Sequence, residues 1–105
     1  MNTYRKGRRG EKRAALKLKA RGYNYVRLTP GSRGPYDVSA TSPRGNRAYV
    51  QVKSGTAHMD KKAKKRLKKY AKERHGIAVY ARENRGKVRF HILANFAKRK
   101  KRRSR

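Results

Sequence analysis

Two stretches of the chain repeat their apolar residues at the spacing of an α-helix. The first covers about residues 8–21 and ends before Gly22, and the second covers about 59–75 and ends before Gly76, since glycine commonly follows the last helical turn. The apolar stripes consist of Ala14, Ala15 and Leu18 in the first helix and of Ala63, Leu67, Tyr70 and Ala71 in the second. We expect residues 1–7 to form a flexible basic arm ahead of the first helix.

Five shorter stretches are rich in β-branched and aromatic residues, and they predict strands. These stretches are 23–28, 36–40, 48–54, 77–82 and 87–93. The connection 41–47 is short enough to favour an antiparallel hairpin of the second and third strands. The segment 29–35 is dense in glycine and proline and predicts a loop. The expected order of elements is therefore α-β-β-β-α-β-β, which is typical of an α/β domain.

The charge of the chain is far from balanced. It has 34 Lys and Arg against 5 Asp and Glu, which gives a net charge of +29. Such a charge opposes folding by self-repulsion and indicates a polyanionic partner. Nucleic acid fits best, because each neutralised phosphate releases counterions. An anionic membrane fits less well, because the basic helices lack a broad apolar face.

Length and residue usage exclude several other classes of protein. With 105 residues, 34% of them hydrophobic, the chain can build one small core. We place the folded domain in residues 1–96 and expect the basic tail, 97–105, to be disordered without a ligand. No apolar run is long enough to span a bilayer and none follows the basic N-terminus, so we expect a cytoplasmic protein. Cysteine is absent and the three histidines lack metal-ligand spacing, which argues against disulfides and a zinc site.

One of the few acids, Asp37, lies inside a predicted strand. Period-two alternation places Asp37 and Ser39 on one face of that strand and its less polar residues, Tyr36, Val38 and Ala40, on the other. In the next strand Gln51 and Lys53 share a face by the same alternation. A hairpin in register would bring Asp37 close to Gln51 and Lys53, and Glu11 could approach them from the inward stripe of the first helix.

Such a set of side chains suits the hydrolysis of a phosphodiester. A hard divalent cation such as Mg²⁺ binds carboxylate and carbonyl oxygens and keeps several of its waters. The cation lowers the pKa of a bound water and stabilises the charge that builds on the phosphate. A nearby lysine can orient the attacking water or stabilise the developing charge electrostatically.

Four short motifs in this order resemble the PD-(D/E)XK nuclease superfamily. They are Glu11 on an N-terminal helix, Gly31-Ser32-Arg33-Gly34, Asp37 and Gln51-Val52-Lys53. Within the superfamily, the stretches YRKGRRGEKRAALKLKARGYNYVRL, GSRGPYDV and AYVQVKSG are similar to the archaeal type of Holliday junction resolvase. The likeness extends over roughly residues 5–93 in element order, with the motif matches in the first half.

The resemblance implies a fold, an activity and partners. The fold would be a small restriction-endonuclease-like α/β domain, with a mixed β-sheet flanked by helices. The protein would act on DNA as a homodimer, each subunit cutting one strand of a four-way junction with Mg²⁺ or, as a substitute, Mn²⁺. No small-molecule cofactor and no membrane are expected, and the relatives suggest an archaeon or its virus as the source. Apolar candidates for a dimer contact are Phe90, Ile92, Leu93 and Phe96.

The resemblance also implies residue roles. The catalytic set would be Glu11, Ser32, Asp37, Gln51 and Lys53, and the metal ligands would be Glu11, Asp37, Gln51 and the backbone carbonyl of Val52. Gln51 stands where the family usually has a glutamate, so this site has one acid fewer. The residues expected to bind DNA are Arg5, Lys6, Arg8, Arg9, Arg33, Lys98, Arg99, Lys100, Lys101, Arg102 and Arg103.

Each of these residues, taken alone, also has a simpler interpretation. Glu11 could complement the helix dipole, Asp37 could accept a hydrogen bond from a turn amide, and Lys53 could belong to a solvated strand face. Their joint occurrence in a protein with so few acids favours the functional interpretation. Two alternatives stay open: a non-catalytic basic nucleic-acid-binding protein, and a related nuclease that acts on nicked, flapped or other DNA.

Overall fold

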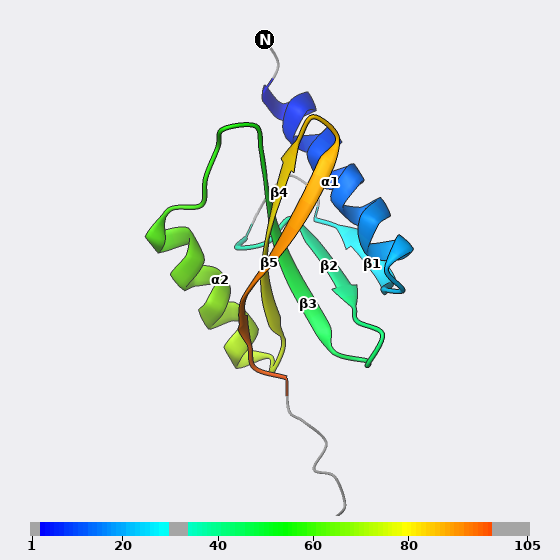
Figure 1. Cartoon of the computed structure of the whole chain (residues 1–105). Helices are drawn as coiled ribbons and strands as arrows, with labels where there is room; N and C mark the ends of the chain where they lie inside the picture. Colours follow the sequence, from blue (N-terminus) through cyan, green and yellow to red (C-terminus); the bar gives the residue numbers. More distant parts are fainter. Residues whose placement is uncertain (1–2, 30–33, 98–105) are drawn as a thin grey trace, which may run out of the picture.

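A five-stranded sheet with one helix on each of its faces forms the body of the protein (Figure 1). The computed structural model describes residues 3–29 and 34–97, with side chains from residue 8 onward. Along the chain the elements are α1 (Thr3–Ala20), β1 (Asn24–Leu28), β2 (Val38–Thr41), β3 (Arg47–Ser54), α2 (Lys61–Glu73), β4 (Ile77–Asn84) and β5 (Lys87–Asn95). This order confirms the predicted pattern α-β-β-β-α-β-β.

The first helix begins at Thr3, so the prediction of a flexible arm over residues 1–7 is wrong for residues 3–7. Arginine and lysine are good helix formers, and an interior glycine such as Gly10 costs only about 1 kcal/mol. That cost is too small to end a helix whose later turns pack on a sheet. The tail predicted at 97–105 lies outside the described residues, apart from Ala97.

The sheet is mixed, and its strands are arranged in the order β1-β2-β3-β4-β5. The pairs β1–β2, β2–β3 and β4–β5 are antiparallel, which includes the hairpin predicted around the connection 41–47. Strands β3 and β4 are parallel, because α2 crosses over between them. Gln51 and Lys53 of β3 thereby gain Tyr80 and Arg82 of β4 as lateral neighbours.

The two helices cover opposite faces of the sheet and define two apolar clusters. On the α1 face, Ala14 and Leu18 pack against alternate strand residues, which are Val38, Ala40, Ala48, Val50, Val52, Ile77, Val79, Ala81 and Val88. On the α2 face, Leu67 and Ala71 pack with Tyr49, Met59, Ala78 and Tyr80. Both helical stripes predicted from periodicity therefore face the sheet. Neither described helix is both long and apolar enough to cross a membrane.

Candidate active site

Asp37 occupies a bend immediately before β2, and its carboxylate is bound to the backbone of β3. The amide of Asp37 donates to the carbonyl of Val50 at 2.8 Å, and Oδ2 of Asp37 accepts the amide of Val52 at 2.9 Å. These two bonds bracket Gln51 from both sides. The predicted pairing of the hairpin is thus present, and it holds a carboxylate opposite Gln51.

The predicted grouping of Tyr36 with Val38 and Ala40 is wrong. Tyr36 packs on the α2 face with Tyr49 and Tyr70, whereas Val38 and Ala40 lie in the cluster beneath α1. The period of two applies only within a strand, and the strand begins at Val38, one residue after the bend. Because of the bend, the position of Asp37 is set by its hydrogen bonds to β3.

Glu11 reaches the site because α1 approaches the end of β3 very closely. A Cβ atom added to Gly10 would lie 2.3 Å from Oγ of Ser54 and 3.4 Å from Oε1 of Glu83. Glycine is therefore the residue that allows this approach. Glu11, the next residue, is 7% exposed and Asp37 is 5% exposed. Two buried carboxylates from distant parts of the chain are brought within electrostatic reach of each other.

The electrostatics of this pair are unfavourable for two negative charges. Burial raises the pKa of Glu11 above its usual value, and the nearby Asp37 raises it further. Burial also raises the pKa of Asp37, although the Val52 amide and the charge of Lys53 act in the opposite direction. Arg8 offsets part of the effect at Glu11 through an ion pair with an Nη1–Oε1 distance of 3.4 Å. Among the described side chains, the positive charge near the two carboxylates does not offset the effect of burial on their pKa values.

Gln51 and Lys53 lie on the α2 face of β3, since the alternating residues Val50 and Val52 face α1. Both side chains are partly exposed. Lys53 is close enough to lower the pKa of Asp37. The described residues contain no cluster of three or more Asp, Glu, His or Cys side chains that could hold a metal ion. The oxygen ligands brought near each other are the carboxylates of Glu11 and Asp37, and Gln51 is the residue of β3 that lies opposite Asp37.

These oxygen ligands suit a hard divalent cation, whereas two carboxylates buried together without a cation repel each other. Mg²⁺ prefers oxygen ligands and is often held by only one or two carboxylates together with substrate oxygens. A cation between Glu11 and Asp37 would also relieve the mutual repulsion that raises the pKa of Glu11.

The other predicted site residues are only partly placed. Ser32, Arg33 and the stretch 98–103 lie outside the described residues, and so do the side chains of Arg5 and Lys6. Of the predicted DNA-binding residues, the structure describes the side chains of Arg8 and Arg9. Arg9 is exposed, whereas Arg8 is partly buried and pairs with Glu11.

Sequence reasoning missed a third buried acid, Glu83, at the end of β4. Its Oε2 accepts the amide of Gly86 at 2.8 Å and an Nη1 hydrogen of Arg13 at 2.9 Å. Burial alone would raise the pKa of Glu83, but these hydrogen bonds lower it below the usual value. The signal in the sequence was Glu83-Asn84-Arg85-Gly86, a turn in which both Arg85 and Gly86 have positive φ.

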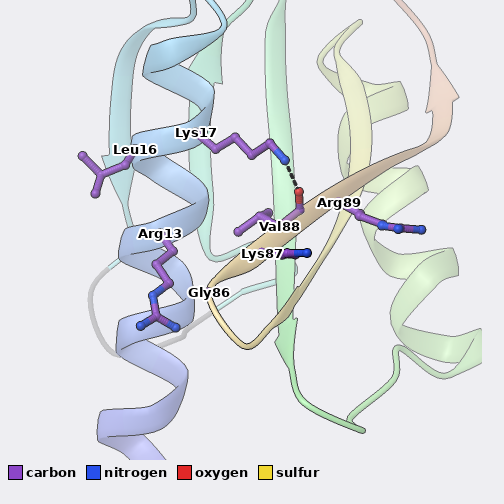
Figure 2. A pocket seen from close by; sticks show the side chains of 7 residues that line it. All are labelled: Arg13, Leu16, Lys17, Gly86, Lys87, Val88 and Arg89. Carbon is purple, nitrogen blue, oxygen red and sulfur yellow. Dashed lines mark hydrogen bonds between the residues drawn. The ribbon is translucent and has the colours of Figure 1, made fainter.

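Glu83 secures the β4–β5 turn beside a groove of about 480 Å³ between α1 and the hairpin. Figure 2 shows Arg13 of α1 directed toward Gly86, and the ammonium group of Lys17 bonded to the carbonyl of Val88. The cationic side chains of Lys87 and Arg89 point away from α1 (Figure 2). The groove is therefore mainly a helix–hairpin junction, with its two inward cations already engaged by the protein.

A five-stranded mixed sheet between two helices, with paired acids and a lysine at one end, is the architecture expected of the nuclease fold that the motifs resemble. Among solved structures, the chain is similar to Hjc from Archaeoglobus fulgidus, described as a Holliday junction resolvase from an archaeal hyperthermophile. The TM-score is 0.69, the identity is 20%, and the match covers 84% of this chain and 73% of that one. The predicted fold class is confirmed. No protein-family model matches the sequence, and no curated protein does either.

Proposed function

We propose that this protein is a metal-dependent DNA endonuclease of the archaeal Holliday junction resolvase type, which cuts four-way junctions by phosphodiester hydrolysis. The observation that carries the proposal is the convergence of Glu11 and Asp37, buried and mutually repulsive, beside Lys53. A protein with only 5 acids and a charge of +29 has buried two of those acids together. Structural stability does not account for this arrangement, because both pKa values are raised.

The proposed metal ligands are Glu11, Asp37, Gln51 and the backbone carbonyl of Val52. Mg²⁺, or Mn²⁺ in its place, would supply Lewis-acid stabilisation of the phosphate and a more acidic bound water. The Val52 amide holds the carboxylate of Asp37 in one orientation. Arg8 does the same for Glu11 from its own helix.

Lys53 is proposed to bind the scissile phosphate and to stabilise the negative charge that develops during hydrolysis. Two facts support this role: it lies two residues after Gln51 on the same strand face, and its charge lowers the pKa of Asp37. Ser32 is proposed to lie near the same phosphate, a role that rests on the sequence motif.

The proposed partner is DNA, bound by a homodimer whose two sites act on opposite strands of the junction. The interface is proposed to involve β5 and the residues after it. Ile92 is 66% exposed there. Phe90, Leu93 and Phe96 are partly exposed. Junction shape and backbone phosphates, rather than base sequence, would then determine the substrate.

The test is an incubation of the protein with a four-way junction, a linear duplex, a nicked or flapped duplex and a single strand. Each substrate is tested with Mg²⁺, Mn²⁺ or EDTA, beside the variant Asp37→Asn. We expect paired, symmetric cuts in the junction that need the metal and the wild-type carboxylate. Preferential cutting of nicked or flapped DNA would assign a related nuclease activity instead.

The second candidate is a non-catalytic nucleic-acid-binding protein, and two observations favour it. The net charge of +29 suffices for tight, sequence-independent binding, and Gln51 replaces an acid that the resembled family usually has. This candidate predicts tight binding of all the DNA forms and no cleavage with either metal. That outcome, with a protein shown to be folded, would overturn the proposed nuclease.

A further inference from the structure

Three cations from three different strands lie in one row across the sheet. Lys53 of β3 is paired with Arg82 of β4, and Arg82 is paired with Arg89 of β5. The sequence places these residues far apart, and the parallel pairing of β3 with β4 is what aligns them. We call Lys53, Arg82 and Arg89 the basic row.

All members of the basic row lie on the α2 face of the sheet. Their strand neighbours Val52, Ala81 and Val88 belong to the cluster under α1, so alternation directs the three cations to the other side. Figure 2 shows Arg89 pointing away from α1, as this register requires. Lys53 and Arg82 are partly exposed and Arg89 is exposed, so the row is open to solvent.

Like charges on directly opposed strand positions destabilise a sheet. Among the ion pairs of the described residues, none within 4 Å includes a member of the basic row. Arg82 instead donates to the carbonyl of Gly55 at 3.4 Å, which holds its side chain near the end of β3. The acids near the row are engaged elsewhere: Glu83 binds Arg13, and Asp37, which Lys53 influences, belongs to the candidate site. An anion from outside the chain would remove this repulsion.

The neighbouring row on the same face begins at the candidate site. Gln51 is paired with Tyr80, and Tyr80 is paired with His91. Tyr80 is only 7% exposed, and within the described part of the chain its hydroxyl has no hydrogen-bond partner. A buried hydroxyl without a partner destabilises the folded state. Beside the site, the sheet therefore carries two arginines, Arg82 and Arg89, that form no ion pair among the described residues, next to a buried hydroxyl that lacks a partner.

We propose that the basic row binds successive backbone phosphates of the DNA strand that leaves the cleavage site, and so sets the direction of the strand across β4 and β5. This inference rests on the proposed function and adds Arg82 and Arg89 as phosphate-binding residues. From Lys53 to Arg89 there are two inter-strand spacings, about 10 Å. That distance equals the axial rise of about three nucleotides of one strand. The contacted phosphates therefore lie within about three nucleotides of the scissile one.

The experiment compares the double variant Arg82→Gln/Arg89→Gln with a matched control, Arg27→Gln/Arg44→Gln. The control loses the same charge from two exposed arginines on β1 and in the β2–β3 turn. Junction binding is measured in EDTA over a range of salt concentrations, after thermal unfolding has shown that both variants fold. We expect the log–log salt slope to become shallower by about 1.8 for the row variant, which is two phosphate contacts at about 0.9 each. The control should change the slope by less than half of that.

Methylphosphonate substitution locates the contacts. Single uncharged linkages are placed at each of the three positions on either side of the cut in a junction. Wild-type protein should lose affinity at two of these positions on one side, and the row variant should show no further loss there. Equal slopes for the row variant and the control, or undiminished sensitivity to the same linkages in the row variant, would overturn the inference.

Failure of the inference is distinguishable from failure of the proposed function. Both variants retain Glu11, Asp37, Gln51 and Lys53, so each should still cut the junction at saturating protein. If the wild type cuts the junction and the row variant keeps the same phosphate contacts, the inference about the basic row is wrong and the proposed nuclease function stands. Absence of cleavage by wild type would reject the nuclease, while the salt slopes would still report whether the row binds phosphate.

Discussion

The protein buries carboxylates in two places, and their surroundings shift the carboxyl pKa in opposite directions. Glu83 receives hydrogen bonds from the Gly86 amide and the Arg13 guanidinium, and its pKa is lowered. Glu11 and Asp37 lie together, and the pKa of each is raised, chiefly by burial. The first arrangement stabilises the charged form in the folded state, whereas the second destabilises it.

This difference in pKa shift distinguishes Glu83, a structural acid, from the candidate functional acids Glu11 and Asp37. A buried carboxylate that accepts hydrogen bonds from a turn amide and from a guanidinium secures a turn, as Glu83 does for the β4–β5 hairpin. Two buried carboxylates with too few donors weaken the fold unless a cation joins them. In a chain of +29 charge, many arginines and lysines could have paired with them, yet among the described side chains only Arg8 forms an ion pair with either carboxylate.

The largest expected effect is that of Asp37→Asn on cleavage. We expect the rate to fall by about 10³-fold, since several kcal/mol of charge stabilisation would be lost with the carboxylate. Glu83→Gln, whose carboxylate is already bonded to Arg13 and to the Gly86 amide, should change the rate by less than about tenfold. Single-turnover cleavage of a junction at saturating protein measures both. Similar losses of rate for the two variants would show that Asp37 is no more important for cleavage than the structural acid Glu83.

The same two substitutions should move stability in opposite directions. The folded-state pKa of Asp37 is raised, so its ionisation at neutral pH opposes folding, and Asp37→Asn should stabilise the metal-free protein. The folded-state pKa of Glu83 is lowered, so its charge contributes stability above the usual carboxyl pKa, and Glu83→Gln should destabilise by about 1–2 kcal/mol. Chemical denaturation at pH 7 in EDTA measures both changes.

The pH dependence sharpens this prediction. As pH falls through the raised pKa of Asp37, the wild-type carboxylate becomes neutral and the advantage of Asp37→Asn should shrink. As pH falls through the lowered pKa of Glu83, the contribution of its charge is lost, so the deficit of Glu83→Gln should also shrink, at a lower pH. Denaturation at intervals from pH 7 into the acid range tests the order. Constant differences over that range would contradict the opposite pKa shifts.

Gln51→Glu adds a carboxylate to the proposed metal site and not to the Glu83 region. We expect free protein to bind Mg²⁺ about tenfold more tightly, and half-maximal cleavage to need less Mg²⁺, because the added charge offsets the positive field. In the wild type, a phosphate oxygen should complete the site, so that DNA and metal bind cooperatively. Calorimetric titration of both proteins, with and without a non-cleavable junction, tests this. Equal Mg²⁺ affinity of free and DNA-bound wild type would contradict the cooperative site.

The smallest effect concerns the close approach of α1 to β3. Gly10→Ala should destabilise the protein slightly or leave it unchanged, because a gain of about 1 kcal/mol in helix propensity opposes the clash with Ser54. Adding Ser54→Ala removes the atom that lies 2.3 Å from the new Cβ. We therefore expect the double variant to exceed Gly10→Ala in stability and to retain cleavage. Thermal unfolding of Gly10→Ala, Ser54→Ala and the double variant gives the coupling free energy between the two positions. Additive effects on stability would show that contact between residues 10 and 54 does not limit how closely α1 approaches β3.

Much of the fold could be predicted because its signals are local. The two apolar stripes at helical spacing, the glycines that follow them and the five β-rich stretches each act within one element. The hairpin that sets Asp37 opposite Gln51 is almost as local, since a short connection joins its strands. The predicted arm failed for residues 3–7 because tertiary packing supports α1 beyond what its glycines suggest.

The sequence by itself determined the order of elements, the excess of positive charge and the motif residues Glu11, Asp37, Gln51 and Lys53. Only the tertiary structure decided which of the scarce acids are buried together and which one is bonded to a turn amide and an arginine. It also decided that Arg82 and Arg89 continue the line begun by Lys53, because the parallel pairing of β3 and β4 joins residues separated by a whole helix. Burial and lateral pairing depend on contacts between distant segments, and local periodicity carries no record of those contacts.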